Sequence, residues 1–229
     1  MTAMTIPQMA LPPVLPVFPL TGVLLLPGTV LPLHIFEPRY RNMVNDALNT
    51  DKIFGVIQPS APQQDNRPLP GTDKETPELY KVGCAGYIES WERFPDGRLF
   101  VQLKGVNRFR FAEELPQLRG YRRVNAIYSD FLDATAGEEW ICERKAILDA
   151  LATFGQARGM EVKPDHAVRF SNVELVNLLA VSLPFHPAEK QALLEAPTLK
   201  DRERILIKLL RLAGSPTDPD DESSSRTLN

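Results

Sequence analysis

The sequence has few of the residues that build metal centres, disulfide frameworks or redox sites. Its 229 residues include two cysteines, Cys84 and Cys142, and three histidines, His34, His166 and His186. The cysteines form no CxxC pair, and the histidines lack the spacing of metal ligands. The sequence therefore predicts no metal and no cofactor. The cysteines are interpreted as buried, reduced thiols, with a single disulfide as the alternative.

Catalytic motifs are also missing. There is no GxxxxGK[ST] phosphate loop, no GxGxxG after an expected strand and no GxSxG nucleophile turn. The adjacent carboxylate pairs at residues 113–114 and 138–139 are interpreted as solvated charges, because neighbouring residues of a strand or helix do not face each other. A catalytic carboxylate pair would have to be assembled by folding. The sequence predicts that the protein is not an enzyme. A cysteine–histidine dyad assembled by folding stays the open alternative.

The sequence also lacks a positive net charge and long uninterrupted apolar runs. The formal net charge of -3 makes nucleic acid an unexpected partner. No Lys or Arg precedes Arg39, so the positive region of a signal peptide is missing. Prolines interrupt the apolar residues 14–36, whereas a membrane-spanning helix needs about 20 apolar residues in a row. We expect a cytoplasmic protein without a membrane segment.

The first half of the chain has the pattern of short β-strands. Pro16 and Pro19 predict that the first strand lies at an edge or a bulge of its sheet. A short helix is expected to begin at Pro38, and residues 95–97 predict a hairpin turn. Strands are expected over residues 14–20, 29–36 (buried), 52–57, 80–91, 99–103, 106–111 and 122–131. Residues 58–79, rich in Pro and Gln, are too long for an ordinary connection and predict a functional or mobile loop.

After residue 133 the apolar spacing becomes helical. Helices are expected over residues 138–154, after a capping box formed by Ser171 and Glu174, from Pro187, and after Thr198. The sequence thus predicts an α+β protein. Its β-rich lobe should span residues 14–132 and its helical lobe residues 138–212, with flexible tails at 1–12 and 213–229.

A basic stretch on the last expected strands has two interpretations. Arg108, Arg110, Arg122 and Arg123 interleave with aromatic residues, as in sheets that stack RNA bases. The other interpretation is that the aromatic side chains enter the core while Arg108 and Arg110 face water. The first makes the protein an RNA-binding accessory module, and we keep this as the alternative function.

Five stretches occur in the order and spacing of one known family. They are residues 15–40 (LPVFPLTGVLLLPGTVLPLHIFEPRY), 54–56 (FGV), 79–86 (LYKVGCAG), 105–109 (GVNRF) and 189–195 (EKQALLE). Together they resemble the N-terminal, substrate-binding domain of Lon proteases, over about residues 14–212. The resemblance implies a PUA-like, six-stranded β-barrel-type lobe followed by a helical-bundle lobe.

The resemblance also implies a function without catalysis. In Lon proteases this domain recognises unfolded or tagged polypeptides, while the ATPase and the Ser–Lys peptidase lie further along the chain. We therefore expect a free-standing, ATP-independent substrate-recognition, adaptor or chaperone-like protein, with a protease or a chaperone as a further partner. The peptide-binding residues are predicted at Phe36, Glu37, Arg39 and Tyr40, with the loop of residues 58–79 as a flap.

Overall fold

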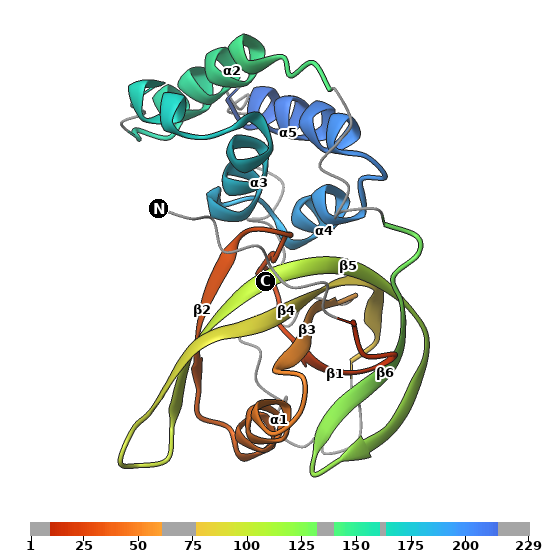
Figure 1. Cartoon of the computed structure of the whole chain (residues 1–229). Coiled ribbons are helices and arrows are strands. Elements are labelled where there is room, and N and C mark those ends of the chain that lie inside the picture. The colour runs from red at the N-terminus through yellow and green to blue at the C-terminus, as the bar shows by residue number, and fades with distance from the viewer. Residues whose placement is uncertain (1–9, 61–76, 132–139, 161–163, 215–229) are drawn as a thin grey trace, which may run out of the picture. The chain divides into compact units, whose positions relative to one another are not determined.

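The computed structural model describes residues 10–60, 77–131, 140–160 and 164–214 (Figure 1). The chain forms two compact units. The first contains residues 1–138 and 181–195, and the second contains residues 139–180 and 196–229. The predicted tails at 1–12 and 213–229 fall almost wholly outside the described residues, as does most of the predicted flap.

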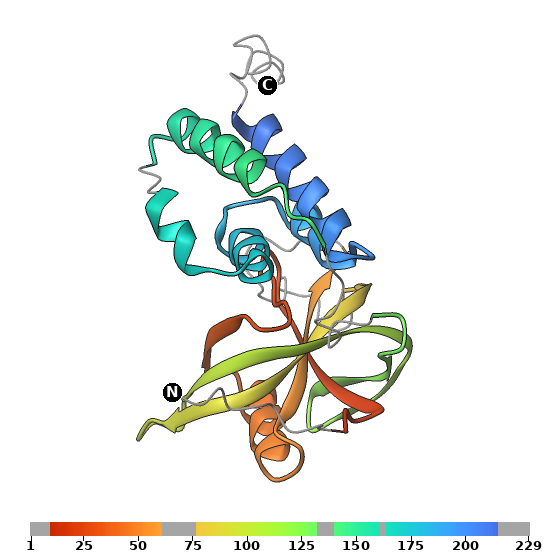
Figure 2. The same ribbon diagram turned by 45° about the horizontal axis from the view of Figure 1, so that its top comes forward.

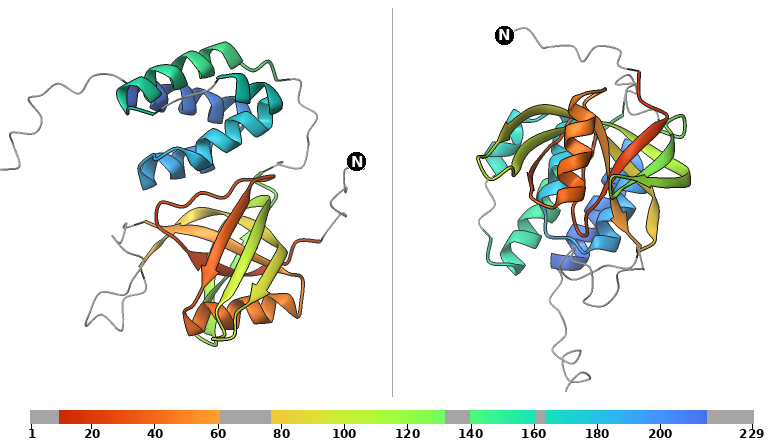
Figure 3. Two further views of the ribbon diagram at one scale, coloured as in Figure 1. Left: turned by 90° about the vertical axis from the view of Figure 1, so that its left-hand side faces the viewer. Right: turned by 90° about the horizontal axis from the view of Figure 1, so that it is seen from below.

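A curled, mixed sheet forms the centre of the first unit. Within the described residues it has six strands, in the order β2-β5-β4-β3-β1-β6. Strand β5 also pairs with β6 at the far end of this order, so the sheet curls back on itself (Figure 3). Among the described strands, only β1 and β3 pair in parallel. The bounds are β1 Val14–Pro19, β2 Val30–Ile35, β3 Ile53–Pro59, β4 Leu79–Arg93, β5 Leu99–Leu118 and β6 Tyr121–Ile127.

The prediction that β1 lies at an edge is wrong, because β1 lies between β3 and β6. It pairs with β6 through residues 14–17 and with β3 through residues 17–19. Pro16 therefore lies in the part of β1 that does not pair with β3, and Pro19 is the last residue of β1. A central strand accommodates both prolines because its two partners cover different halves of it. The expected buried strand at residues 29–36 is instead the edge strand β2, which is buried on one face only.

The two expected strands at residues 99–103 and 106–111 form one continuous strand, β5. Gly105 lies at the expected break. A Cβ atom on Gly105 would come within 2.1 Å of the carbonyl oxygen of Leu26, so only glycine fits this close approach. Opposite, β4 has a register shift between Ala85 and Gly86, which is typical of a β-bulge.

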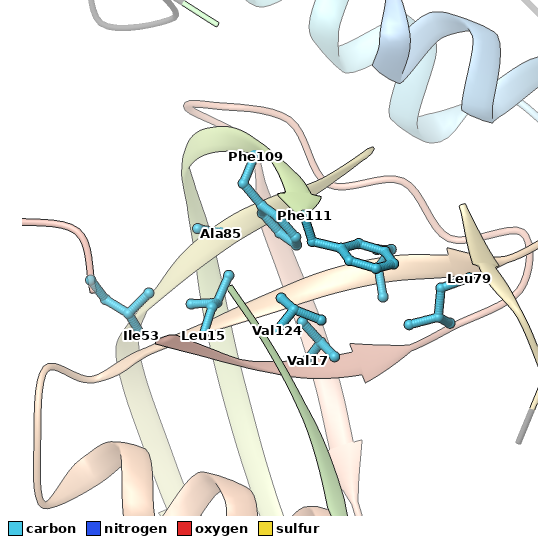
Figure 4. Close-up of a cluster of buried hydrophobic side chains, with 9 residues drawn as sticks. Leu15, Val17, Ile53, Leu79, Ala85, Phe109, Phe111 and Val124 are labelled. Carbon is cyan, nitrogen blue, oxygen red and sulfur yellow. The ribbon is translucent and has the colours of Figure 1, made fainter. Parts of the chain in front are cut away.

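The inner face of the sheet carries the core of this unit. Phe109 and Phe111 alternate into it, as the strand period predicts. Figure 4 shows these rings meeting side chains from the neighbouring strands. The cluster comprises Leu15, Val17, Ile53, Ile57, Leu79, Ala85, Phe109, Phe111 and Val124.

Helix α1 (Pro38–Leu48) covers one end of the curled sheet (Figure 3). Pro38 occupies its first turn as expected, and it buries Tyr40, Met43, Val44 and Ala47. The helix is tied to the β5–β6 hairpin, since the Tyr121 hydroxyl donates a hydrogen bond of 2.9 Å to Asp46.

The second unit is helical. It contains α2 (Arg144–Ala157), the 3-10 helix η1 (Pro164–Arg169), most of α3 (Asn172–Ser182) and α5 (Leu199–Gly214), and α2 lies beside α5 (Figure 2). The expected helix at residues 138–154 begins later, at Arg144. The capping box is confirmed: the Ser171 N–H donates to Glu174 Oε2 at 2.8 Å, and the Glu174 N–H donates to Ser171 Oγ at 3.3 Å.

Helix α4 (Pro187–Glu195) groups with the sheet, whereas the sequence places it in the helical lobe. The expected boundaries of the two lobes stay a prediction, but the reason for this difference is visible. Polar side chains of α4 bond to backbone and side-chain groups of the sheet unit. Apolar spacing along a sequence does not report such bonds.

Candidate functional site

The segment that follows β2 presents one large apolar side chain to solvent. Phe36 is 63% exposed. It lines a hollow of about 290 Å³ together with His34, Ile35, Phe94, Arg98 and Leu99. This volume is at the lower limit of ligand pockets, so the hollow suits a single apolar side chain better than a whole cofactor.

The next residues of the predicted peptide site have structural roles. Glu37 is the N-cap residue of α1, and its carboxylate accepts a hydrogen bond of 2.9 Å from Arg39 Nε. The Arg39 guanidinium lies 4.6 Å from the centre of the Tyr40 ring. Tyr40 is only 7% exposed and packs on Phe18, with ring centres 4.1 Å apart. The ring therefore belongs to the core, and its burial raises the pKa of Tyr40 to about 12.

The β4–β5 hairpin completes the hollow. Sequence reasoning missed its contribution, from Phe94, Arg98 and Leu99. The expected turn at residues 95–97 is confirmed, since the Phe94 N–H donates to the Arg98 carbonyl at 2.9 Å. This bond places Phe94 beside Arg98 at the end of the sheet. The sequence offered one signal for this contribution: an aromatic residue, Phe94, stands directly before the predicted hairpin turn. Nothing in the sequence indicates that Phe94 lies near Phe36.

The four arginines of the alternative RNA interface do not form an open basic surface. The prediction that Arg108 faces water is wrong: it is 2% exposed, and it donates a hydrogen bond of 2.8 Å to the Leu194 carbonyl. Arg122 is 8% exposed, donates to both carboxylate oxygens of Glu114 and also to the Pro77 carbonyl.

The two remaining arginines are exposed or partly exposed, and each has a partner. Arg110 donates a hydrogen bond of 2.8 Å to Asp130, and Arg123 donates one of 2.9 Å to the Pro116 carbonyl. Bidentate and carbonyl bonds hold arginine side chains within the protein. These arginines therefore stabilise β5 and β6, and nothing in the structure supports the RNA-binding alternative.

A buried polar cluster lies under α4. The Gln191 amide donates to the Val82 carbonyl and to Glu195, while the Gln58 amide donates to Gln191 and to the Pro187 carbonyl. Lys190 Nζ donates a hydrogen bond of 3.0 Å to the Gly22 carbonyl, and burial lowers its pKa. Lys190 and Gln191 of the family pattern therefore attach α4 to the sheet unit, while Glu195 accepts its bond from Gln191 within the same helix.

Among the described residues, no group of three or more His, Cys, Asp or Glu side chains could hold a metal ion, and no helix is long and apolar enough to cross a membrane. Cys84 is buried. Burial, and a hydrogen bond to Glu203, raise the pKa of Cys142 to about 12, which disfavours its reactive thiolate form. The Ser171 hydroxyl is engaged in the helix cap.

The sequence of the chain is similar to part of several Lon proteases. Lon protease 2 of Myxococcus xanthus is 28% identical over 212 residues, which are 87% of this chain and 24% of that protein. Lon protease 1 of Hydrogenovibrio crunogenus is 28% identical over 202 residues, which are 85% of this chain and 23% of that protein. The chain thus spans about a quarter of the length of these relatives.

Two solved structures share the fold. The Lon N-terminal domain protein of Xanthomonas campestris is 25% identical, with a TM-score of 0.57 over 86% of this chain and 96% of that one. The N-terminal domain of Mycobacterium avium complex Lon protease is 17% identical, with a TM-score of 0.56 over 86% and 97%. A family model described as the ATP-dependent protease La (LON) substrate-binding domain matches residues 14–211. The chain therefore belongs to the Lon substrate-binding domain family.

Proposed function

We propose that this chain is a cytoplasmic, non-catalytic protein that binds unfolded or tagged polypeptides, as an adaptor or a chaperone-like protein. One observation carries the proposal. In a member of a substrate-binding family, Phe36 is 63% exposed beside an apolar hollow. Exposed apolar surface is unfavourable unless a partner covers it, and apolar side chains are what an unfolded polypeptide offers.

The aromatic pair suits weak and unselective binding. Phe36 and Phe94 lie on two different segments at the rim of the same hollow. Aromatic rings supply a large apolar contact area, while the small hollow holds one side chain at a time. A substrate-recognition protein has to bind many sequences and release them, and a shallow apolar contact allows both.

The test is binding of a permanently unfolded protein, such as reduced and carboxymethylated lactalbumin, measured by fluorescence anisotropy. Phe36→Ser should weaken binding about tenfold, a typical loss for an apolar anchor. Leu118→Ser is the matched control, because Leu118 is also exposed but lies at the end of β5, outside the hollow. Equal binding by both variants and the unchanged protein would contradict the proposal.

The non-catalytic part of the proposal has its own test. The purified protein should hydrolyse neither casein nor ATP, because the sequence has no GxxxxGK[ST] phosphate loop and no GxSxG nucleophile turn, and burial together with Glu203 raises the pKa of Cys142 to about 12. Turnover that disappears in Cys84→Ala or Cys142→Ala would make the protein an enzyme.

A further inference from the structure

Strand β2 has an open edge. Among the described residues it pairs with β5 alone, over residues 30–35, and it is the first strand of the sheet order. Figure 1 shows β2 along the border of the sheet, next to β5 of the long β4–β5 hairpin. An open edge presents unpaired backbone N–H and C=O groups to a further strand.

The pairing with β5 determines which backbone groups face this edge. The Gly105 N–H donates a hydrogen bond of 2.9 Å to the Thr29 carbonyl. In an antiparallel pair alternate residues point their backbone groups at the partner. Residues 31, 33 and 35 therefore face β5, while Val30, Pro32 and His34 face the open edge. Pro32 fits this assignment, because it has no N–H to donate to β5.

The same residues have their side chains on the open face of the sheet. Val30, Pro32 and His34 are exposed, whereas Leu33 and Ile35 are buried. His34 also lines the hollow with Phe36. Residues opposite each other on adjacent strands point to the same face. A strand added next to His34 would therefore place a side chain over the hollow.

We propose that β2 binds an extended polypeptide segment by strand addition, while the hollow takes one apolar side chain of that segment. The inference rests on the proposed function and specifies its substrate class: extended segments with an apolar residue, recognised mainly through their backbone. Backbone hydrogen bonds tolerate many sequences, and the apolar side chain supplies the selection.

Pro32 argues against a second copy of this chain as the occupant. Two β2 strands paired antiparallel around a two-fold axis would each place a proline, without an N–H donor, in the new ladder. A segment of another polypeptide meets only one missing N–H donor, that of Pro32. It can still form both backbone hydrogen bonds with His34. The single proline therefore limits self-association while leaving the end of β2 beside the hollow available.

The experiment uses the full chain and three blocked nine-residue peptides of threonine, valine and lysine with one central phenylalanine. One peptide is unmodified. The other two carry N-methyl groups on the amides of even or of odd residues. Because one alternate set of amides faces the partner strand, exactly one methylated peptide should bind at least tenfold more weakly. The other should bind within about twofold of the unmodified peptide.

Titrations into the isotope-labelled chain, followed by NMR, give affinity and location together. Shifts should concentrate at residues 30–36 and 94–99, and they should weaken in Phe36→Ser but not in Leu118→Ser. Equal binding of both methylated peptides, or binding of unfolded lactalbumin without any peptide binding, would overturn strand addition and leave the proposed function standing. Binding of neither peptides nor lactalbumin would overturn both. If the chain forms a dimer and Phe36→Ser dissociates it, the open edge of β2 binds a second copy of the chain. That outcome would also contradict the inference.

Discussion

Two regions of the sheet unit differ in which kind of side chain they bury and which they expose. At the end of β2, the aromatic side chain of Phe36 is exposed beside a hollow. Beneath α4, the polar side chains of Gln58 and Gln191 are withdrawn from water and hydrogen-bonded. Phe36 and Gln191 both lie in stretches of the family pattern, residues 15–40 and 189–195.

This difference in burial distinguishes residues that stabilise the fold from residues that are accessible to a ligand. The buried amides have partners that compensate their desolvation, so removing one leaves its partners unsatisfied. Removing the exposed Phe36 side chain costs the folded state little, because water already surrounds much of it. Membership of a family pattern therefore does not tell which residues bind a ligand, whereas burial and partners do.

Tyr40→Ala should have the largest effect on stability, although Tyr40 belongs to the same segment as Phe36. The variant removes a buried ring that packs on Phe18, and we expect a loss of about 3 kcal/mol in the free energy of unfolding. Urea denaturation followed by Trp91 fluorescence, in a Trp140→Phe background, reports on the sheet unit. A loss below about 1 kcal/mol would show that this segment does not belong to the core.

Gln191→Leu should cost about 2 kcal/mol, because the Val82 carbonyl and Gln58 lose a buried hydrogen-bond partner. The same denaturation experiment measures it. The control is Gln117→Leu, which replaces an exposed glutamine of β5 and should change stability by less than about 0.5 kcal/mol. Similar values for the two variants would remove the contrast between the buried and the exposed region.

Ser171→Ala extends the comparison to an exposed pair of hydrogen bonds. It removes the cap of α3 and should cost about 1 kcal/mol, less than the buried Gln191. Trp140 fluorescence in a Trp91→Phe background reports on the helical unit, where the Trp140 indole N–H donates to Glu203. Ser129→Ala, at an exposed serine outside any helix, serves as the control. A cost above about 2 kcal/mol would mean that burial does not govern the ranking.

Phe36→Ser should have the smallest effect on stability, within about 0.5 kcal/mol, while it weakens polypeptide binding. Thermal unfolding and the lactalbumin assay, made on one preparation, measure the two effects together. A variant that loses stability and binding in parallel would place Phe36 with Tyr40 in the core.

Patterns along the chain were sufficient for most local structure. The capping box at Ser171, the helix start at Pro38 and the turn at residues 95–97 are short-range chemistry, and all three are confirmed. The alternation that sends Phe109 and Phe111 into the core is equally local. The family pattern is also a property of the sequence, and the family model confirms it over residues 14–211.

Three features depend on contacts between segments that are distant in sequence, and only the tertiary structure decided them. Arg108 was expected in water by strand alternation, but the Leu194 carbonyl, 86 residues away, accepts its hydrogen bond inside the protein. The hollow joins Phe36 to Phe94 across two separate segments. Helix α4 groups with the sheet, and its Gln191 amide donates a hydrogen bond to the Val82 carbonyl, 109 residues away. Sequence alone determined which side chains were available, while folding determined which of them are buried and paired, because both conditions depend on neighbours far along the chain.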